Sequence, residues 1–198
     1  MNSEAVRAGT IFITGISASG KSTLGKRLQE DLLKSGVSDV KLLDGEEMRK
    51  SLQKRGRYYG YSTDERNKIA LKFAQIASEY NKQGFICVLC SICHIEKIRQ
   101  QMRAIIGNVM EVYLDCPVSV CAKRDYKGNY DKAFKGLYSN FIGVTEPYQK
   151  SDKVELCLNT EKNSVEESAQ LLFKSTVSFL ESMQVDSERS NDKNFIIS

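Results

Sequence analysis

Residues 15–22, Gly-Ile-Ser-Ala-Ser-Gly-Lys-Ser, decide the fold of this chain. They match the pattern G-x-x-x-x-G-K-[ST], in which glycines let successive backbone N–H groups turn toward a bound polyphosphate. An apolar run over residues 10–14 precedes them, and a stretch with helical spacing of leucines follows. Because that helix would add the positive end of its dipole at the loop, this order of elements predicts a phosphate-binding P-loop.

The side chains of the loop have separate expected tasks. Lys21 would reach the outer phosphates of a nucleotide, and Ser22 would ligate Mg²⁺. A glycine-rich turn without a nucleotide is the competing interpretation, and the flanking strand and helix argue against it. The loop residues predicted to contact the nucleotide are Gly15, Ser17, Ser19, Gly20, Lys21, Ser22 and Thr23.

The bulk composition is typical of one globular domain. The chain has 198 residues, 41% hydrophobic and 27% charged, enough to bury a core on both faces of a sheet. Its net charge of +4 arises without a dense run of Lys or Arg, which argues against a nucleic-acid partner and suits a small anionic substrate. No apolar run approaches the about 20 residues of a membrane-spanning helix, so no membrane partner is expected.

Cysteine usage bears on the compartment and on metal binding. Six cysteines lie at positions 87, 90, 93, 116, 121 and 157, several in apolar stretches, and the N-terminus lacks a signal-peptide apolar region. A reducing, cytoplasmic location is therefore expected. Cys87, Cys90 and Cys93 recur at a spacing of three, but residues 85–90 have the pattern of a buried strand and the single histidine is His94. A buried strand is thus favoured over a metal site.

Short apolar runs alternate with helical patterns along the chain. Strands are predicted at residues 10–14, 40–43, 85–90, 109–114 and 154–158. Because helices separate them, we expect a P-loop NTPase fold of the α/β class, a three-layer αβα sandwich with a mostly parallel five-stranded sheet. The helix faces predicted to be buried are Leu24, Leu28 and Leu32 in one helix and Ile69, Phe73, Ile76 and Tyr80 in another.

The same patterns give the domain boundaries. A single domain is expected over residues 1–184, with a polar, disordered tail over residues 185–198. Thr63 or Asp64 is the predicted N-cap of the second helix, and a last helix over residues 164–183 begins with a capping box, Ser-Val-Glu-Glu. Residues 127–151 hold glycines, aromatics and lysines with little periodicity, which is typical of a lid or binding loop.

Asp44-Gly45-Glu46 follows the second predicted strand, at the edge where parallel α/β sheets place ligand groups. Asp44 or Glu46 is expected to hydrogen-bond a sugar hydroxyl and assist its deprotonation, or to hold the water shell of a metal ion. Together with Lys21, these two residues are the candidate catalytic groups. The structural alternative for Asp44 is a helix N-cap, with acidic residues in the first turn.

Further motifs extend the pattern over most of the chain. They are LDGEEMR at 43–49, YS at 61–62 with DER at 64–66, DCP at 115–117 with RD at 124–125, KGNYDKA at 127–133, FIG at 141–143, EPY at 146–148 and LNT at 158–160. With the P-loop, this series resembles the adenylylsulfate (APS) kinases, P-loop kinases that transfer the γ-phosphate of ATP to the 3′-hydroxyl of adenosine 5′-phosphosulfate. The resemblance implies ATP and Mg²⁺ as cofactors, a small nucleotide acceptor as partner, and a homodimer.

The resemblance also implies roles for single residues. Arg124 falls at the lid over ATP, Arg49 and Arg66 match arginines that grip the phosphosulfate, and Tyr61 and Phe141 match an aromatic pair around the acceptor's base. Taken alone, surface salt bridges would explain the arginines, including one from Arg124 to Asp115 or Asp125, and core packing would explain the aromatics. The implied acceptor-binding set is Asp44, Arg49, Tyr61, Arg66, Ile92, Cys93, Lys132, Phe141, Ile142 and Gly143.

Several positions depart from the family pattern on the acceptor side. Residues 90–96, Cys-Ser-Ile-Cys-His-Ile-Glu, stand where the family has Ser-x-Ile-Ser-Pro-Tyr-Arg, and Ile69 and Ile142 replace polar residues. The alternative acceptor is therefore cytidine diphosphoramidate, used by a related kinase of capsule phosphoramidate synthesis. His94 either acts on the acceptor or faces solvent at a helix start. The alternative of another class is a non-catalytic nucleotide-binding regulatory protein, against which the intact charged residues argue.

Overall fold

The structure is a computed structural model that describes residues 8–57 and 60–194. Residues 1–7 and 58–59 of the predicted domain (1–184) and residues 195–198 of the predicted tail (185–198) lie outside the described residues. In chain order the elements are β1 (Thr10–Thr14), α1 (Lys21–Lys34), β2 (Val40–Asp44), α2 (Gly45–Lys54), α3 (Thr63–Lys82), β3 (Ile86–Cys90), α4 (Glu96–Ile106), β4 (Val109–Asp115), α5 (Val118–Arg124), α6 (Asn129–Phe134), β5 (Leu156–Asn159) and α7 (Val165–Asn194).

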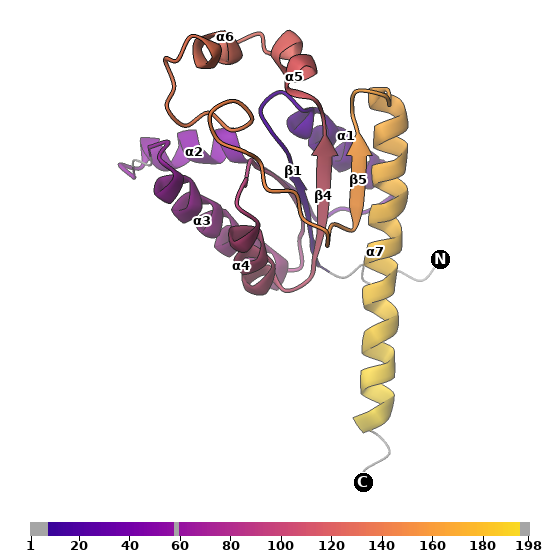
Figure 1. Ribbon diagram of the computed structural model, residues 1–198. Helices are drawn as coiled ribbons and strands as arrows, with labels where there is room; N and C mark the ends of the chain where they lie inside the picture. The colour runs from indigo at the N-terminus through magenta and orange to yellow at the C-terminus, as the bar shows by residue number, and fades with distance from the viewer. Residues whose placement is uncertain (1–7, 58–59, 195–198) are drawn as a thin grey trace.

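The five strands form one parallel sheet in the order β2-β3-β1-β4-β5. Helices α1 and α7 cover one face, α3 and α4 cover the other, and α5 and α6 lie beyond the carboxyl ends of the strands (Figure 1). The predicted three-layer α/β sandwich is confirmed. Throughout residues 8–57 and 60–194, every helix is too short or too polar to cross a membrane.

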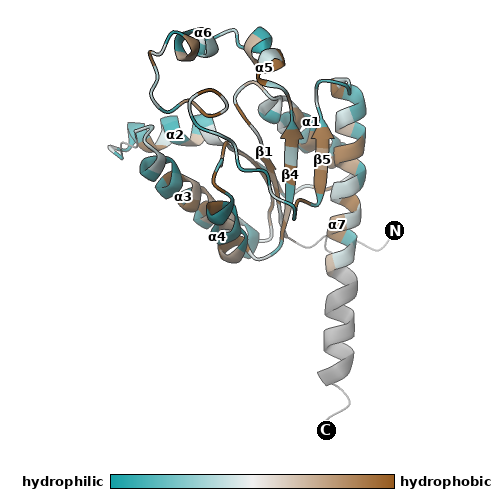
Figure 2. Cartoon of the chain, viewed as in Figure 1, coloured by the Kyte–Doolittle hydropathy of each residue, from teal (hydrophilic) through white to brown (hydrophobic). Residues whose placement is uncertain are grey.

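The core explains why these segments fold as they do. Alternate residues of β1 enter opposite layers, since Ile11 and Ile13 pack with α1 and α7 while Phe12 packs with α3 and α4. The central strands β1, β3 and β4 are buried on both faces and are therefore mostly apolar, whereas the helices carry polar residues outward (Figure 2). Of the predicted helix faces, Leu24, Leu28, Leu32, Ile69 and Phe73 are buried, and Ile76 and Tyr80 are partly buried.

Some helix ends in the structure differ from those predicted from the sequence. Ser62, rather than Thr63 or Asp64, is the N-cap of α3, because the Glu65 carboxylate accepts from the Ser62 backbone N–H while the Ser62 hydroxyl accepts from the Glu65 N–H. The capping box predicted before α7 is present, with the Glu167 carboxylate accepting from the Ser164 N–H at 2.8 Å. Helix α7 then continues past residue 183 to Asn194, where the sequence pattern predicts a loose tail.

A buried arginine anchors the far end of the segment at 127–151. Arg99 of α4 pairs with Glu111 of β4 at 2.8 Å, and both side chains are almost fully buried. The same guanidinium donates to the backbone oxygens of Cys93 and Gln149, at 2.9 and 2.6 Å. Arg99 therefore ties the exit of β3 to the end of the predicted lid, over the ring of Tyr148.

Helix α1 lies unusually close to the sheet at Gly25. A Cβ added there would be 2.3 Å from the sulfur of Cys90 and 3.2 Å from a methyl group of Leu42. Glycine inside a helix costs about 1 kcal/mol relative to alanine. The close approach of α1 to the sheet explains why glycine nevertheless occupies position 25. The approach sets the position of the helix that begins at the P-loop.

We predict that Gly25→Ala lowers the free energy of unfolding by roughly 1–3 kcal/mol, since the new methyl group overpacks the contact with Cys90. Urea denaturation measures the change. Adding Cys90→Ala to the same chain should recover most of the loss, with Cys90→Ala alone as the matched control. A Gly25→Ala protein at least as stable as the wild type would contradict the packing described.

Candidate active site

The P-loop joins β1 to α1 and depends on its glycines. A side chain at Gly15 would come within 2.9 Å of the Leu114 carbonyl oxygen and of the Ser19 hydroxyl. Gly20 has a φ of +103°, in the left-handed region that glycine adopts without strain, and α1 begins directly after it. The loop therefore presents backbone N–H groups and the N-terminus of a 14-residue helix to one place.

Lys21 is held inside this loop. Its ammonium donates to the Ile16 carbonyl oxygen at 2.6 Å, and desolvation lowers the pKa of Lys21 to about 8, against the opposing influence of nearby Cys90, Cys121 and Asp44. An arriving polyphosphate would raise the pKa of Lys21, because a negative charge favours the protonated amine. The position of Lys21 inside the loop is compatible with its predicted role as a phosphate ligand.

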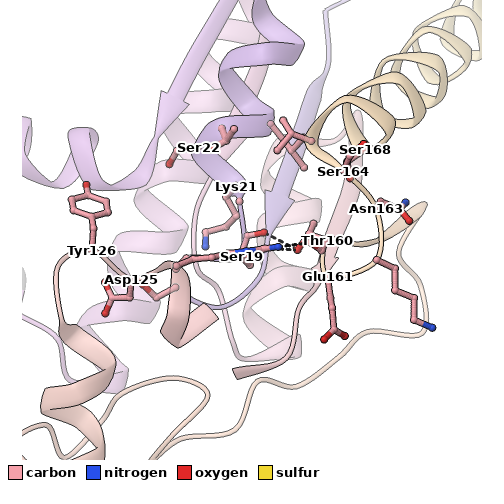
Figure 3. Close-up of a pocket in the computed structure, with 18 of the residues that line it drawn as sticks. Ser19, Lys21, Ser22, Asp125, Tyr126, Thr160, Glu161, Asn163, Ser164 and Ser168 are labelled. Carbon is pink, nitrogen blue, oxygen red and sulfur yellow. Dashed lines mark hydrogen bonds between the residues drawn. The ribbon is translucent and has the colours of Figure 1, made fainter. Parts of the chain in front are cut away.

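A cleft of about 890 Å³ opens beside the loop (Figure 3). Its walls are residues 17–24, Glu46, residues 124–127, residues 160–165 and Ser168. Of the predicted nucleotide contacts, Gly15 underlies the loop, whereas Ser17, Ser19, Gly20, Lys21, Ser22, Thr23 and Arg124 all line the cleft. The Ser19 hydroxyl is fully buried and has no hydrogen-bond partner among the described residues.

Arg124 bonds to the last residue of the motif at 158–160 and not to an aspartate. It donates to the carbonyl oxygen of Thr160 at 2.7 Å, and the Thr160 hydroxyl donates to the Ser19 carbonyl oxygen at 3.0 Å. The alternative pairings are not formed, because Asp125 accepts from backbone N–H groups and Asp115 pairs with Lys150. Thr160 joins Arg124 to the P-loop at the wall of the cleft, and its signal in the sequence is the motif at 158–160, for which no site role was predicted.

Asp44 divides its two carboxylate oxygens between separate partners. One caps α2 by accepting from the N–H groups of Glu46 and Glu47, at 2.9 and 3.3 Å. The other accepts from the Ser22 hydroxyl at 2.5 Å. The capping interpretation and the functional interpretation are thus compatible, and a hydroxyl beside a carboxylate is the oxygen donor set that suits Mg²⁺.

Glu46 is engaged elsewhere. Its carboxylate accepts from Lys127 at 2.6 and 2.7 Å and lies 3.1 Å from Lys50. Lys127 is the main reason that the pKa of Glu46 is lowered. Of the two carboxylates predicted for catalysis, only Asp44 contacts the P-loop in this structure, and Glu46 bonds across the cleft instead.

A second group of candidate residues gathers beyond α2. Arg49 and Arg66 both lie over the ring of Tyr61, with guanidinium carbons 4.7 and 5.3 Å from its centre. Burial and the nearby Arg49 lower the pKa of Arg66. Two guanidinium groups over one exposed aromatic ring suit a ligand that carries an anionic group next to a planar group. Asn140 completes the group by donating to the Tyr61 carbonyl oxygen at 2.6 Å, a contact that no sequence pattern indicated.

The remaining acceptor-side candidates are distributed around this group. Phe141 packs edge-on against Tyr130, with ring centres 4.9 Å apart, and Ile142 is buried beneath it with Ile92 nearby in the same apolar cluster. Gly143 has a φ of +95° and donates to the Glu146 carbonyl oxygen at 2.7 Å. Lys132 is exposed on α6.

Cys93 and His94 lie deeper than the sequence pattern indicated. Cys93 is buried among the apolar residues between the sheet and α3, and burial raises its pKa to about 12. His94 does not face solvent: it is 3% exposed, and its Nε2 lies 2.9 Å from a Glu146 oxygen. Desolvation lowers the pKa of His94 and so favours the neutral imidazole, against the opposing influence of the nearby Glu146 carboxylate.

The fold and the cleft together define a P-loop kinase. The adenylylsulphate kinase family matches residues 7–159. Curated adenylyl-sulfate kinases from Halothermothrix orenii and Microcystis aeruginosa are 35% and 33% identical over 160 and 162 residues, covering 81% and 82% of this chain and 84% and 87% of their own lengths. The solved structure of an APS kinase from Mycobacterium tuberculosis in complex with AMPPNP and APS is similar, with a TM-score of 0.78 and 29% identity over 86% of this chain and 98% of that one. The chain belongs to the adenylylsulphate kinase family.

Because Asp44 both caps α2 and contacts Ser22, we predict that its substitution affects stability and Mg²⁺-dependent ATP binding separately. Asp44→Asn keeps an oxygen that caps α2 but removes the charge beside Ser22, whereas Asp44→Ala removes both. We expect Asp44→Ala to lower the free energy of unfolding by about 1 kcal/mol, Asp44→Asn to lower it far less, and both to weaken Mg²⁺-dependent binding of ATP.

Urea denaturation and calorimetric titration measure these quantities. A fully stable alanine variant would contradict the capping role, and undiminished Mg²⁺-dependent binding by the asparagine variant would contradict the role at the metal.

Proposed function

We propose that this protein transfers the γ-phosphate of ATP to the 3′-hydroxyl of adenosine 5′-phosphosulfate. The observation that carries the proposal is that one helix, α2, connects two charged sites. Its N-terminus is capped by Asp44, which bonds to Ser22 of the P-loop, and its next turn carries Arg49 over Tyr61. A phosphate donor on the P-loop and an anionic, planar acceptor on the arginine group would thus face each other.

The chemistry follows from these positions. The 3′-oxygen forms a bond to the γ-phosphorus while the bond from that phosphorus to the bridging oxygen of ADP breaks, and the hydroxyl proton is released to solvent. Such transfers proceed through loose transition states, so the protein mainly positions the reactants and stabilises charge. Lys21, the P-loop N–H groups and Arg124 would supply that stabilisation. Mg²⁺, held by Ser22 and Asp44, would neutralise charge on the phosphates.

The acceptor assignment rests on the arginine group and on the relatives. Arg49 and Arg66 suit a phosphosulfate, and Tyr61 with Phe141 supplies aromatic surface for a base. The relatives described above are named adenylyl-sulfate kinases, which favours APS over cytidine diphosphoramidate and an enzyme over a non-catalytic regulatory protein. A homodimer and a cytoplasmic location remain predictions.

The direct test is ADP release from MgATP with and without APS. We expect ADP to form at a substantial rate only when APS is present, and Lys21→Ala to reduce turnover by at least about a hundredfold, the order of loss caused by removing one charge-stabilising donor. Circular dichroism of the variant checks that the fold is retained. An active Lys21→Ala protein, or ADP release that is indifferent to APS, would overturn the proposal.

A further inference from the structure

The predicted lid is attached to the start of α3 at two places. In the first, the Arg66 guanidinium donates to the Asn140 carbonyl oxygen at 3.2 Å, and the Asn140 amide donates to the Tyr61 carbonyl oxygen at 2.6 Å. In the second, the Thr63 hydroxyl donates to the Glu146 carboxylate at 3.0 Å. Because Arg66 and Tyr61 are expected to contact the acceptor, only the second attachment consists of side chains without such a task.

His94 extends the second attachment into the core. Its imidazole Nε2 lies 2.9 Å from a Glu146 oxygen, and its side chain is 4% exposed, against 23% for Glu146. Among the described residues, this nitrogen has no other partner. The His94 carbonyl oxygen also accepts from the Gln149 N–H at 2.9 Å. One carboxylate of the lid is thus held from two elements, by His94 after β3 and by Thr63 on α3.

The surroundings of the Glu146 carboxylate stabilise its negative charge. Thr63 is the first residue of the 20-residue helix α3, and a helix N-terminus carries a positive partial charge. Desolvation lowers the pKa of Arg66 and of His94, and the Glu146 carboxylate opposes both shifts. The charge of Glu146 therefore interacts favourably with α3 on one side and with the core on the other.

Glu146 also closes the turn that carries predicted acceptor contacts. Its N–H donates to the Phe141 carbonyl oxygen at 3.2 Å, and its carbonyl oxygen accepts from the Gly143 N–H at 2.7 Å. Ile142, within the turn, is buried. A Glu146 side chain fixed on α3 therefore fixes the backbone of Phe141 relative to Arg66 on the same helix.

We propose that His94 and Glu146 are positioning residues for the acceptor nucleotide. Their contact, completed by Thr63, docks the turn at 141–146 on α3 and sets the distance between the aromatic and the cationic side chains that bind the acceptor. None of the three residues lines the nucleotide cleft, so their loss should weaken binding of the acceptor and spare ATP. The inference rests on the proposed function in one respect, that this turn binds the acceptor.

Steady-state kinetics with APS separates positioning from a general loss of structure. We expect Thr63→Val and Glu146→Ala to raise KM for APS roughly 10- to 100-fold, the value of a hydrogen bond to a charged group, while kcat and KM for ATP change far less. His94→Leu should raise KM for APS by a smaller factor, because Thr63 still holds the carboxylate.

Two further variants serve as controls for this comparison. Thr63→Ser keeps the hydroxyl and should stay close to the wild-type KM for APS. Asp64→Asn removes a carboxylate from the same turn of α3 without removing a group of the contact, and it should change neither KM.

Hydrogen–deuterium exchange tests the docking without any acceptor. We expect His94→Leu and Glu146→Ala to speed exchange at the backbone amides of residues 141–146, because the turn opens more often. Amides of the P-loop should exchange as in the wild type, and Asp64→Asn should leave both regions unchanged.

Unchanged KM for APS in Thr63→Val and Glu146→Ala, an equal rise of KM for ATP, or unaltered exchange at residues 141–146 would each overturn the inference. A wild type that phosphorylates cytidine diphosphoramidate and not APS would contradict the proposed function alone, and the same comparison with that acceptor then decides the role of His94 and Glu146. A wild type that phosphorylates neither compound would contradict the proposed function and this inference together.

Discussion

The carboxylate of Asp44 links the phosphate loop to the acceptor side of the site. It bonds to the Ser22 hydroxyl and also caps α2. Because a rigid helix follows that cap, the position of Arg49 is set relative to the P-loop without a contact between the two. Under the proposed function, the placement of the phosphate donor relative to the acceptor would depend on this side chain at the end of β2.

A buried ion pair lies beneath the predicted acceptor side of the site. Arg99, paired with Glu111 in the core, donates to the carbonyl oxygens of Cys93, after β3, and of Gln149, near the end of the 127–151 segment. Removing Glu111 would leave the buried Arg99 guanidinium without its carboxylate, whereas removing Arg99 would leave Glu111 with Arg103, 3.5 Å away. His94 and Glu146 lie above it, and the Thr63 hydroxyl donates to the same Glu146 carboxylate at 3.0 Å. Of the departures from the family pattern at this place, His94 is part of a buried polar network, whereas Cys93 packs among apolar side chains.

Local patterns predicted most of the fold. The P-loop, the five strands and the buried helix faces follow from glycine positions and from periodicity, which a few neighbouring residues determine. The N-cap of α3 was missed by one or two positions because Ser62 is chosen by its reciprocal bonds with Glu65. The length of α7 was missed because a polar helical segment has the same composition as a loose tail.

The site was only partly predictable for a physical reason. The residues of the P-loop act through their own backbone, so the sequence identifies them directly. The contacts of Thr160 with Arg124, Asn140 with Tyr61 and Lys127 with Glu46 join segments 36 to 81 residues apart, and only the folded chain shows them. The roles of the candidate residues in binding and catalysis remain predictions that the variants described above test.

The identity of the acceptor is the central claim. The most direct measurement offers APS and cytidine diphosphoramidate side by side with MgATP, and follows ADP release while mass and ³¹P NMR spectra locate the added phosphate. The proposed function predicts turnover of APS, with one phosphoryl group gained at the 3′-oxygen of the adenosine. Turnover of the cytidine compound alone would contradict it and would mean that the buried polar network at His94 belongs to a pocket for a different nucleotide.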